Sequence, residues 1–205
     1  MSLYLHSIAL PAIVLTDHEQ KILLTATSER RRAFRDHMLF ALALGTGLRV
    51  HELVALDVGD ITNESGAVRR RVQLRVFKRS AGNPMPQEVI LPERLRLKLG
   101  KFLKWKAEKG ESVKPGAPLF LSERRSRLST RQVRYLFATW QKRAGFERHL
   151  HFHALRHTAC SNLYRRTKDL RVVQRFGRHK SVVTTSRYSH PSDTEHFAAL
   201  QSLPC

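Results

Sequence analysis

Tyr188 is the residue of this chain whose type and setting most directly suggest covalent chemistry. A phenol oxygen can attack a phosphodiester where cations offset the charge of the phosphate and a proton donor assists the leaving oxygen. Several basic side chains of the sequence could fill these two roles. They are Arg49, Lys78, His153, Arg156 and His179. The residue types therefore predict phosphoryl transfer that needs no metal or other cofactor, with Tyr188 as nucleophile.

The two arginines of this set suit the binding of a phosphate. Each guanidinium can donate two parallel N–H bonds to non-bridging oxygens, which a lysine cannot do as rigidly. His153 and Arg156 are three residues apart, so a helix would present both on one face, with His157 close to it. Positive charge of this kind would favour the phenolate of Tyr188. We therefore expect the pKa of Tyr188 to lie below its ordinary value of about 10.

Glu52 and Lys78 carry little information when each is taken alone. Glu52 lies three residues after Arg49. That spacing fits either a surface ion pair of small energetic value or a support that orients Arg49 or a neighbouring histidine. Lys78 ends a strand-like segment, so a hairpin could carry it over a bound phosphate as general acid for the leaving 5′ oxygen. A lone tyrosine or a lone HxxRH segment is more often structural.

Taken together and in order, seven positions resemble the catalytic pattern of the tyrosine recombinase (phage-integrase-type) family. They are Arg49, Glu52, Lys78, His153, Arg156, His179 and Tyr188. The flanking segments GTGLRVHELVALDVGDI and HKSVVTTSRYSH are similar to family boxes, and the resemblance covers about residues 16–200. Two departures stand out. A long, proline-bearing hairpin leaves Arg79 as an alternative to Lys78, and Arg178 stands where the family usually has glycine.

The resemblance implies a fold and a mechanism. The fold is mainly α with a small antiparallel β-sheet, that of the family's catalytic domain. Tyr188 would form a 3′-phosphotyrosyl bond and release a 5′ hydroxyl, and a second strand would reverse the step. The partners implied are double-stranded DNA and three further copies of the chain, as a homotetramer on two duplexes. The location implied is cytoplasmic and nucleoid-associated.

Composition independently favours an anionic partner. The 205 residues carry 37 Lys and Arg against 17 Asp and Glu, a formal net charge of +20. Such an excess repels itself and usually meets a polyanion, with nucleic acid ahead of an anionic membrane surface. The longest apolar stretch falls well short of the roughly 20 residues that a spanning helix needs. Cys160 and Cys205 form no disulfide framework, which favours a reducing compartment.

Periodicity predicts the elements that position these residues. Capping-box patterns at Thr16, Ser129 and Ser192 predict three helix starts. The alternation of apolar and basic residues over 68–76 predicts a strand, with a return strand over 88–91. An apolar stripe beginning at Leu95 predicts a helix whose outer face is almost entirely basic. Further helical patterns cover residues 33–44, 48–56, 153–165 and 169–176.

The helices that begin at Ser129 and at Leu95 are the candidates for contact with DNA. The residues expected to bind DNA on the helix from Ser129 are Arg131, Arg134, Lys142 and Arg143. We expect an extension or linker over residues 1–15, the catalytic domain over 16–190, and a tail helix over 191–205 that docks on a neighbouring subunit or packs locally. The family's N-terminal DNA-clamping domain has no room ahead of this pattern. The chain is therefore either an excised catalytic domain or a short recombinase like the fimbrial DNA invertases.

Three other function classes remain open at this stage. A non-catalytic DNA-binding relative would keep the fold without the chemistry, although all seven positions are occupied by competent residues. A type IB topoisomerase-like enzyme would share the chemistry and only relax DNA. A basic RNA-binding protein would require that seven positions match by coincidence.

Overall fold

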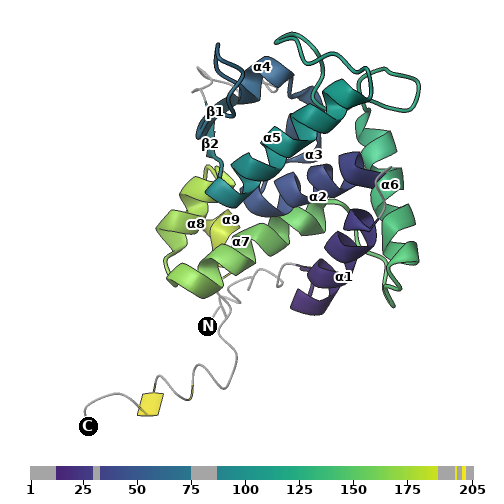
Figure 1. Ribbon diagram of the computed structural model, residues 1–205. Coiled ribbons are helices and arrows are strands. Elements are labelled where there is room, and N and C mark those ends of the chain that lie inside the picture. Colours follow the sequence, from purple (N-terminus) through teal and green to yellow (C-terminus); the bar gives the residue numbers. More distant parts are fainter. Residues whose placement is uncertain (1–12, 30–32, 75–86, 189–196, 198–199, 202–205) are drawn as a thin grey trace.

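The computed structural model describes residues 13–29, 33–74, 87–188, 197 and 200–201. Within these ranges the chain is mainly helical and carries one two-stranded antiparallel sheet (Figure 1). This confirms the predicted fold class. The helices are α1 Asp17–Ser28, α2 Phe34–Thr46, α3 Val50–Ala55, α4 Val58–Ile61, α5 Glu93–Glu108, α6 Thr130–Arg143, α7 His153–Thr167, α8 Leu170–Gly177 and α9 Val182–Ser186. The strands are β1 Arg71–Leu74 and β2 Gln87–Ile90.

Helix α2 forms the centre of the core. It packs against α1, α5 and α7, and Figure 1 shows it enclosed by them. Met38, Leu39 and Phe40 are fully buried side by side, as expected for a helix that is apolar on all sides. The ring of Phe40 meets the rings of Phe137 and Phe152, whose centroids lie 5.7 and 6.4 Å away. These contacts join α6 and the start of α7 to the centre of the molecule.

Two of the predicted helix starts are confirmed as capping boxes. The Thr16 hydroxyl accepts a bond from the Glu19 N–H, and the Glu19 carboxylate accepts one from the Thr16 N–H. Ser129 and Gln132 make the same reciprocal pair at the start of α6. The third predicted start, at Ser192, lies outside the described residues. Helices α4 and α9 were not predicted, because elements of four or five residues show no helical period.

The sheet lies beside α4 at one edge of the molecule (Figure 1). Val72 pairs with Val89 in an antiparallel register, and both side chains are buried, which matches the predicted alternation. The strand begins at Arg71 rather than at Val68, because Val68 pairs with Thr62 in an isolated bridge instead. The predicted hairpin tip with Lys78 and Arg79 lies outside the described residues.

Helix α5 buries one basic residue along with its apolar stripe. Leu95, Leu99 and Phe102 form the buried stripe as expected. Lys106, four residues after Phe102, is also fully buried, and its Nζ lies 2.8 Å from a carboxylate oxygen of Glu111. The long apolar stem of a lysine can cross the core while its ammonium reaches an acid at the rim, and the sequence pattern does not distinguish this case.

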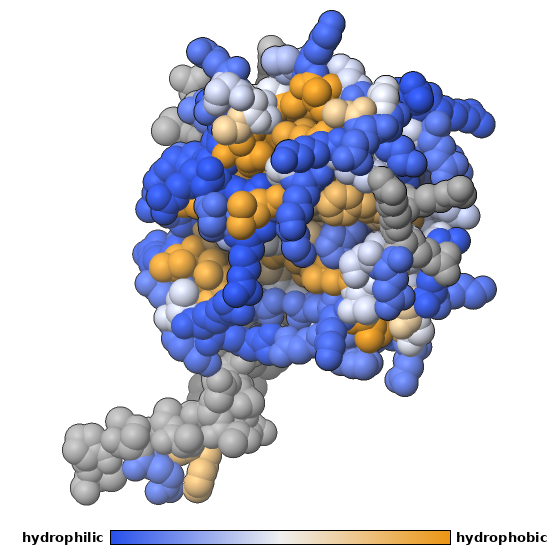
Figure 2. Space-filling view, viewed as in Figure 1, coloured by the Kyte–Doolittle hydropathy of each residue, from blue (hydrophilic) through white to orange (hydrophobic). Residues whose placement is uncertain are grey.

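The surface is largely hydrophilic. Figure 2 shows hydrophilic side chains over most of the visible face, with separate apolar patches between them. Among the described residues, no helix combines the length and the apolar character needed to cross a membrane. Phe197 and Leu200, the described apolar residues of the predicted tail, are exposed.

Candidate active site

Arg49 and Glu52 form a unit at the start of α3. Arg49 is the N-cap residue, and its N–H donates to Oε2 of Glu52 over 2.6 Å. The Arg49 guanidinium donates to Oε1 of the same carboxylate over 2.9 Å. Glu52 is only 3% exposed, whereas the Arg49 side chain is one-third exposed. The pair is therefore no surface ion pair: a buried carboxylate fixes an arginine whose outer part still reaches the surface.

Arg178 holds the same carboxylate from the other side. Its Nη2 donates to Oε2 of Glu52 over 2.7 Å, and both side chains are buried. Burial alone would raise the pKa of Glu52, but Arg178, then the N–H and guanidinium of Arg49, outweigh it and hold that pKa below its ordinary value. Glu52 thus carries its charge between two guanidinium groups.

The backbone explains how an arginine occupies a position where glycine is usual in the family. Arg178 caps the C-terminal end of α8 with φ 52° and ψ 46°, the left-handed conformation that glycine adopts most readily there. An L side chain in this conformation costs about 1–2 kcal/mol. The ion pair with Glu52 offsets that cost. The sequence marks Arg178 as a departure from the family pattern but does not indicate its contact with Glu52.

Arg156 connects the two turns that carry these groups. It lies on α7, is 3% exposed, and donates from Nη1 to the carbonyl of Gly47 and from Nη2 to the carbonyl of Gly177. Burial, followed by the nearby charge of Arg49, lowers the pKa of Arg156 to about 10, which leaves it charged at neutral pH. The residue predicted to bind phosphate is also a link between the ends of α2 and α8.

Glycine is required at both of these turns. Gly47 has φ 61°, and a Cβ there would lie 2.9 Å from the Phe176 ring. A Cβ on Gly177 would lie 2.7 Å from Cε1 of His179. Close approach of backbone and rings therefore brings the start of α3, the end of α8 and His179 together.

Tyr188 is buried at the centre of this arrangement. It is 7% exposed and packs with Cys160 and Val173 in a small second core. Its hydroxyl lies 2.6 Å from Nδ1 of His157 on α7. Burial, and next to it the thiol of Cys160, raises the pKa of Tyr188 well above its ordinary value, against the pull of Arg156. The prediction of a lowered pKa was wrong, because desolvation of the phenolate exceeds the attraction of the guanidinium.

Two predicted site histidines contact this pair: His179 meets Tyr188, and His153 meets His157. The His179 ring is nearly parallel to the Tyr188 ring, with centroids 5.9 Å apart, and its Nδ1 lies 3.0 Å from the hydroxyl of buried Thr185. The His153 ring meets the His157 ring edge-on at 4.5 Å. Thr185 was not among the predicted site residues, and the signal that could have indicated it is its place three residues before Tyr188.

All three histidines favour the neutral form in this structure. Burial and then His153 lower the pKa of His157 to about 4, and burial and then Arg156 lower that of His179 to about 4. The pKa of His153 is lowered by burial and by Arg156. These shifts arise from desolvation and neighbouring cations, so an anion bound among them would raise the pKa of each.

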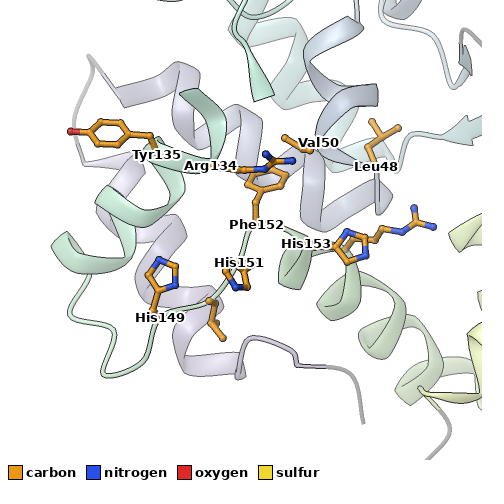
Figure 3. Close-up of a pocket in the computed structure, with 10 residues that line it drawn as sticks. Leu48, Val50, Arg134, Tyr135, His149, His151, Phe152 and His153 are labelled. Atoms are coloured by element: carbon orange, nitrogen blue, oxygen red, sulfur yellow. The ribbon is translucent and has the colours of Figure 1, made fainter. Parts of the chain in front are cut away.

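A cavity of about 590 Å³ opens beside His153 and Arg156. Figure 3 shows Arg134 and Tyr135 projecting from α6, with His149 and His151 on the segment that leads into α7. Of the four basic residues predicted to contact DNA, Arg134 lines this cavity. Arg131, Lys142 and Arg143 are exposed elsewhere on α6, and Arg143 lies over the Trp140 ring, 5.1 Å from its centroid.

The described elements thus bring together six of the seven residues of the predicted catalytic pattern, and Lys78 lies outside them. In the parts of the chain that the structure describes, His, Cys, Asp and Glu form no cluster of three or more that is suited to a metal ion.

Known proteins resemble the chain in sequence. The profile of the phage integrase family matches residues 14–195. Tyrosine recombinase XerC of Actinobacillus pleuropneumoniae is 32% identical over 178 residues, 87% of this chain and 54% of that protein. Tyrosine recombinase XerC of Caldanaerobacter subterraneus subsp. tengcongensis is 33% identical over 194 residues, 94% of this chain and 51% of that protein. The chain spans about half the length of the curated relatives it matches.

Solved structures agree with the sequence matches. The crystal structure of XerA recombinase is similar with a TM-score of 0.74 and 26% identity, covering 95% of this chain and 66% of that one. The XerH site-specific recombinase bound to its difH substrate, in a pre-cleavage complex, gives a TM-score of 0.71 at 20% identity. That match covers 98% of this chain and 57% of the XerH chain, and at this identity it shows the fold.

Proposed function

Because this chain belongs to the phage integrase family, we propose that it carries the catalytic domain of a site-specific DNA recombinase, over about residues 16–190. The observation that carries the proposal is the position of Tyr188. Its hydroxyl is hydrogen-bonded by His157 in a site that also contains Arg156, Arg49 and His179. A buried tyrosine that served packing alone would not need the basic side chains of Arg156, His157 and His179 around it.

The proposed reaction proceeds in two transesterifications. Arg49 and Arg156 bind the non-bridging oxygens of the scissile phosphate, and His153 and His179 add hydrogen bonds to it. The Tyr188 oxygen attacks phosphorus. The 5′ oxygen leaves and takes up a proton, and we propose Lys78 as the donor of that proton. The bond energy is kept in the 3′-phosphotyrosyl link, so the 5′ hydroxyl of another strand can attack it and join new partners without ATP.

Glu52 and Arg178 act on this reaction through Arg49. A free arginine side chain samples many conformations, whereas Arg49 is tied to Glu52 by both its backbone N–H and its guanidinium. Arg178 in turn fixes the carboxylate. The phosphate therefore meets a cation that is already oriented, which reduces the entropy lost when the substrate binds.

Double-stranded DNA is the proposed partner. The net charge of +20 and the exposed basic residues of α6 support binding to a phosphate backbone. Arg134, which lines the cavity beside His153 and Arg156, is the residue of this helix best placed to meet DNA near the scissile phosphate. We further propose that four copies act on two duplexes, since strand exchange needs two active sites on each duplex.

A strand-transfer assay tests the proposed function. Labelled nicked duplexes, drawn from a pool that includes DNA flanking the gene, are incubated with the chain and with unlabelled acceptor duplexes in EDTA. Recombination predicts labelled strands that have gained the length of the acceptor. Relaxation of supercoiled plasmid without such products would contradict a recombinase and indicate a topoisomerase-like activity.

A further inference from the structure

The contact between His157 and Tyr188 has no counterpart among the catalytic positions predicted from the sequence. His157 follows Arg156 directly on α7, and its Nδ1 lies 2.6 Å from the Tyr188 hydroxyl. The two rings are tilted by 49° with centroids 5.7 Å apart, so the contact runs through the ring edge rather than through stacking. It is a direct polar contact to the atom that forms the new bond.

The other two histidines are engaged differently. Nδ1 of His179 pairs with the Thr185 hydroxyl, and the His179 ring lies parallel to the Tyr188 ring rather than meeting the hydroxyl edge-on. His153 meets the edge of His157 and lines the cavity together with Arg156. Among the described residues, His157 is therefore the histidine that the structure places on the nucleophile, while His153 faces the cavity.

We propose that His157 is a catalytic residue that accepts the proton of Tyr188 when the phenol attacks the phosphate, an inference that rests on the proposed recombinase activity. The Oη–P bond forms as the O–H bond breaks, and the proton moves to Nδ1 of His157. The P–O5′ bond breaks, and the leaving oxygen takes its proton from the general acid. Resealing reverses each transfer, so that His157 returns the proton to the tyrosine.

The charges around His157 explain why this transfer depends on bound DNA. Burial, and after it the neighbouring His153, Arg187 and Arg156, oppose a positive charge on the ring. Without DNA these effects keep His157 neutral, so a lone pair stays available on a ring nitrogen. A phosphate bound by the arginines offsets those charges and stabilises the imidazolium that the reaction produces. His157 is therefore unprotonated before DNA binds, and its basicity increases when the phosphate is bound.

Two substitutions separate proton transfer from positioning. His157→Asn places an amide oxygen near the position of Nδ1, so it can accept the hydrogen bond and cannot take the proton. His157→Ala removes both functions and leaves space for free imidazole. His18→Ala, an exposed histidine on α1, is the matched control. The readout is the rate of covalent adduct formation on nicked duplexes, with affinity for the same duplexes measured separately.

We expect both His157 variants to form adduct about 10²–10³-fold more slowly than the wild-type chain, with DNA affinity changed less than about threefold. Imidazole should restore part of the rate of His157→Ala and none of the rate of His157→Asn. A wild-type rate in His157→Asn would overturn proton transfer and leave a positioning role. Wild-type adduct formation in His157→Ala would overturn both.

A second measurement keeps this inference separate from the proposed function. Nitrogen-15 NMR of histidine-labelled chain without DNA should show Nδ1 of His157 unprotonated and the ring proton on Nε2. Tyr188→Phe should shift the Nδ1 resonance. A proton on Nδ1 in the wild-type chain would overturn the inference whatever the activity. A bound wild-type chain that forms no adduct would instead contradict the recombinase proposal, and with it the catalytic role of His157.

Discussion

Replacing Glu52 by Gln tests the account of the cation cluster. The substitution keeps the shape of the side chain and removes the one negative charge that the structure places between Arg49 and Arg178. Gln can still accept a hydrogen bond through its amide oxygen. It leaves the Arg178 guanidinium, on a side chain that is 6% exposed, without a counter-charge. Among the described residues, Nε of Arg178 has no hydrogen-bond partner, and the other hydrogen bond of the group is a long one from Nη1 to the carbonyl of Phe176.

The expected loss follows from burial. Removing one partner of a buried ion pair costs about 3–5 kcal/mol, because the remaining charge stays desolvated. The Arg49 contribution is smaller, on the order of 0–1 kcal/mol, since that side chain is one-third exposed. Allowing for the retained hydrogen bond, we expect Glu52→Gln to lower the free energy of unfolding by about 3 kcal/mol. For a chain of this size that corresponds to a fall in Tm of about 6–12 °C.

The assay is thermal and urea unfolding of four proteins: wild type, Glu52→Gln, Arg178→Gly and the double variant. Arg178→Gly removes the buried cation together with the left-handed backbone cost of about 1–2 kcal/mol. It should therefore stabilise the Glu52→Gln background. Glu93→Gln is the matched control, because Glu93 forms an exposed (i, i+3) pair with Arg96 and should change stability by less than about 1 kcal/mol.

Two results would refute this reasoning. One is a Glu52→Gln variant no less stable than Glu93→Gln, which would mean that the buried charges are not coupled. The other is a double variant that is less stable than Glu52→Gln alone. The account expects the opposite, because removing a buried arginine that has lost its counter-charge should raise the free energy of unfolding.

Further predictions concern close packing and pH. Gly177→Ala places a methyl group against the His179 ring, so the rate of adduct formation should fall at least tenfold. The control Gly100→Ala, where a methyl group meets open space, should leave the rate of adduct formation unchanged and raise the free energy of unfolding by about 0.5–1 kcal/mol. DNA affinity should rise as pH falls from 7.5 to 6, because His153 and His179 have lowered pKa values and a bound phosphate favours their charged forms. Calorimetry in two buffers should detect proton uptake, and proton release would contradict this. Without DNA, the lowered pKa values of His157 and His179 mean that the unfolded chain binds more protons than the folded chain at acidic pH. The free energy of unfolding should therefore be unaffected by these histidines above pH 6.5 and should fall towards pH 4, by on the order of 1 kcal/mol per histidine after discounting for partial exposure. Urea midpoints that do not fall over this range would oppose the prediction.

Local patterns predicted much of the fold because they act over a few residues. The capping boxes at Thr16 and Ser129 satisfy backbone N–H groups within one turn, so their residues mark helix starts wherever the helix lies. The alternation that buries Val72 and Leu74 in β1 is equally local. Lys106 shows the limit, because its burial depends on Glu111 beyond the end of α5.

The sequence named residues that lie together in the structure, but it did not predict their contacts. Arg49, Glu52 and Arg156 could be named because each stands in a segment that resembles a family box. The contact between Arg178 and Glu52 joins residues 126 positions apart, and no pattern of spacing indicates it. The raised pKa of Tyr188 was missed for a related reason. Charge can be counted in a sequence, whereas the burial that outweighs it comes from the packing of Cys160 and Val173 around the ring.

The most direct test of the central claim is covalent capture of DNA by Tyr188. Nicked duplexes, which lose the short strand after cleavage and so trap the intermediate, are incubated with the chain in EDTA and run on a denaturing gel. We expect an adduct with wild type and with Tyr164→Phe, whose ring packs beside the same small core, and none with Tyr188→Phe. Mass spectrometry should place the nucleotide on the peptide that contains Tyr188. An adduct that persists in Tyr188→Phe, or no adduct on DNA that the wild-type chain binds, would contradict the account.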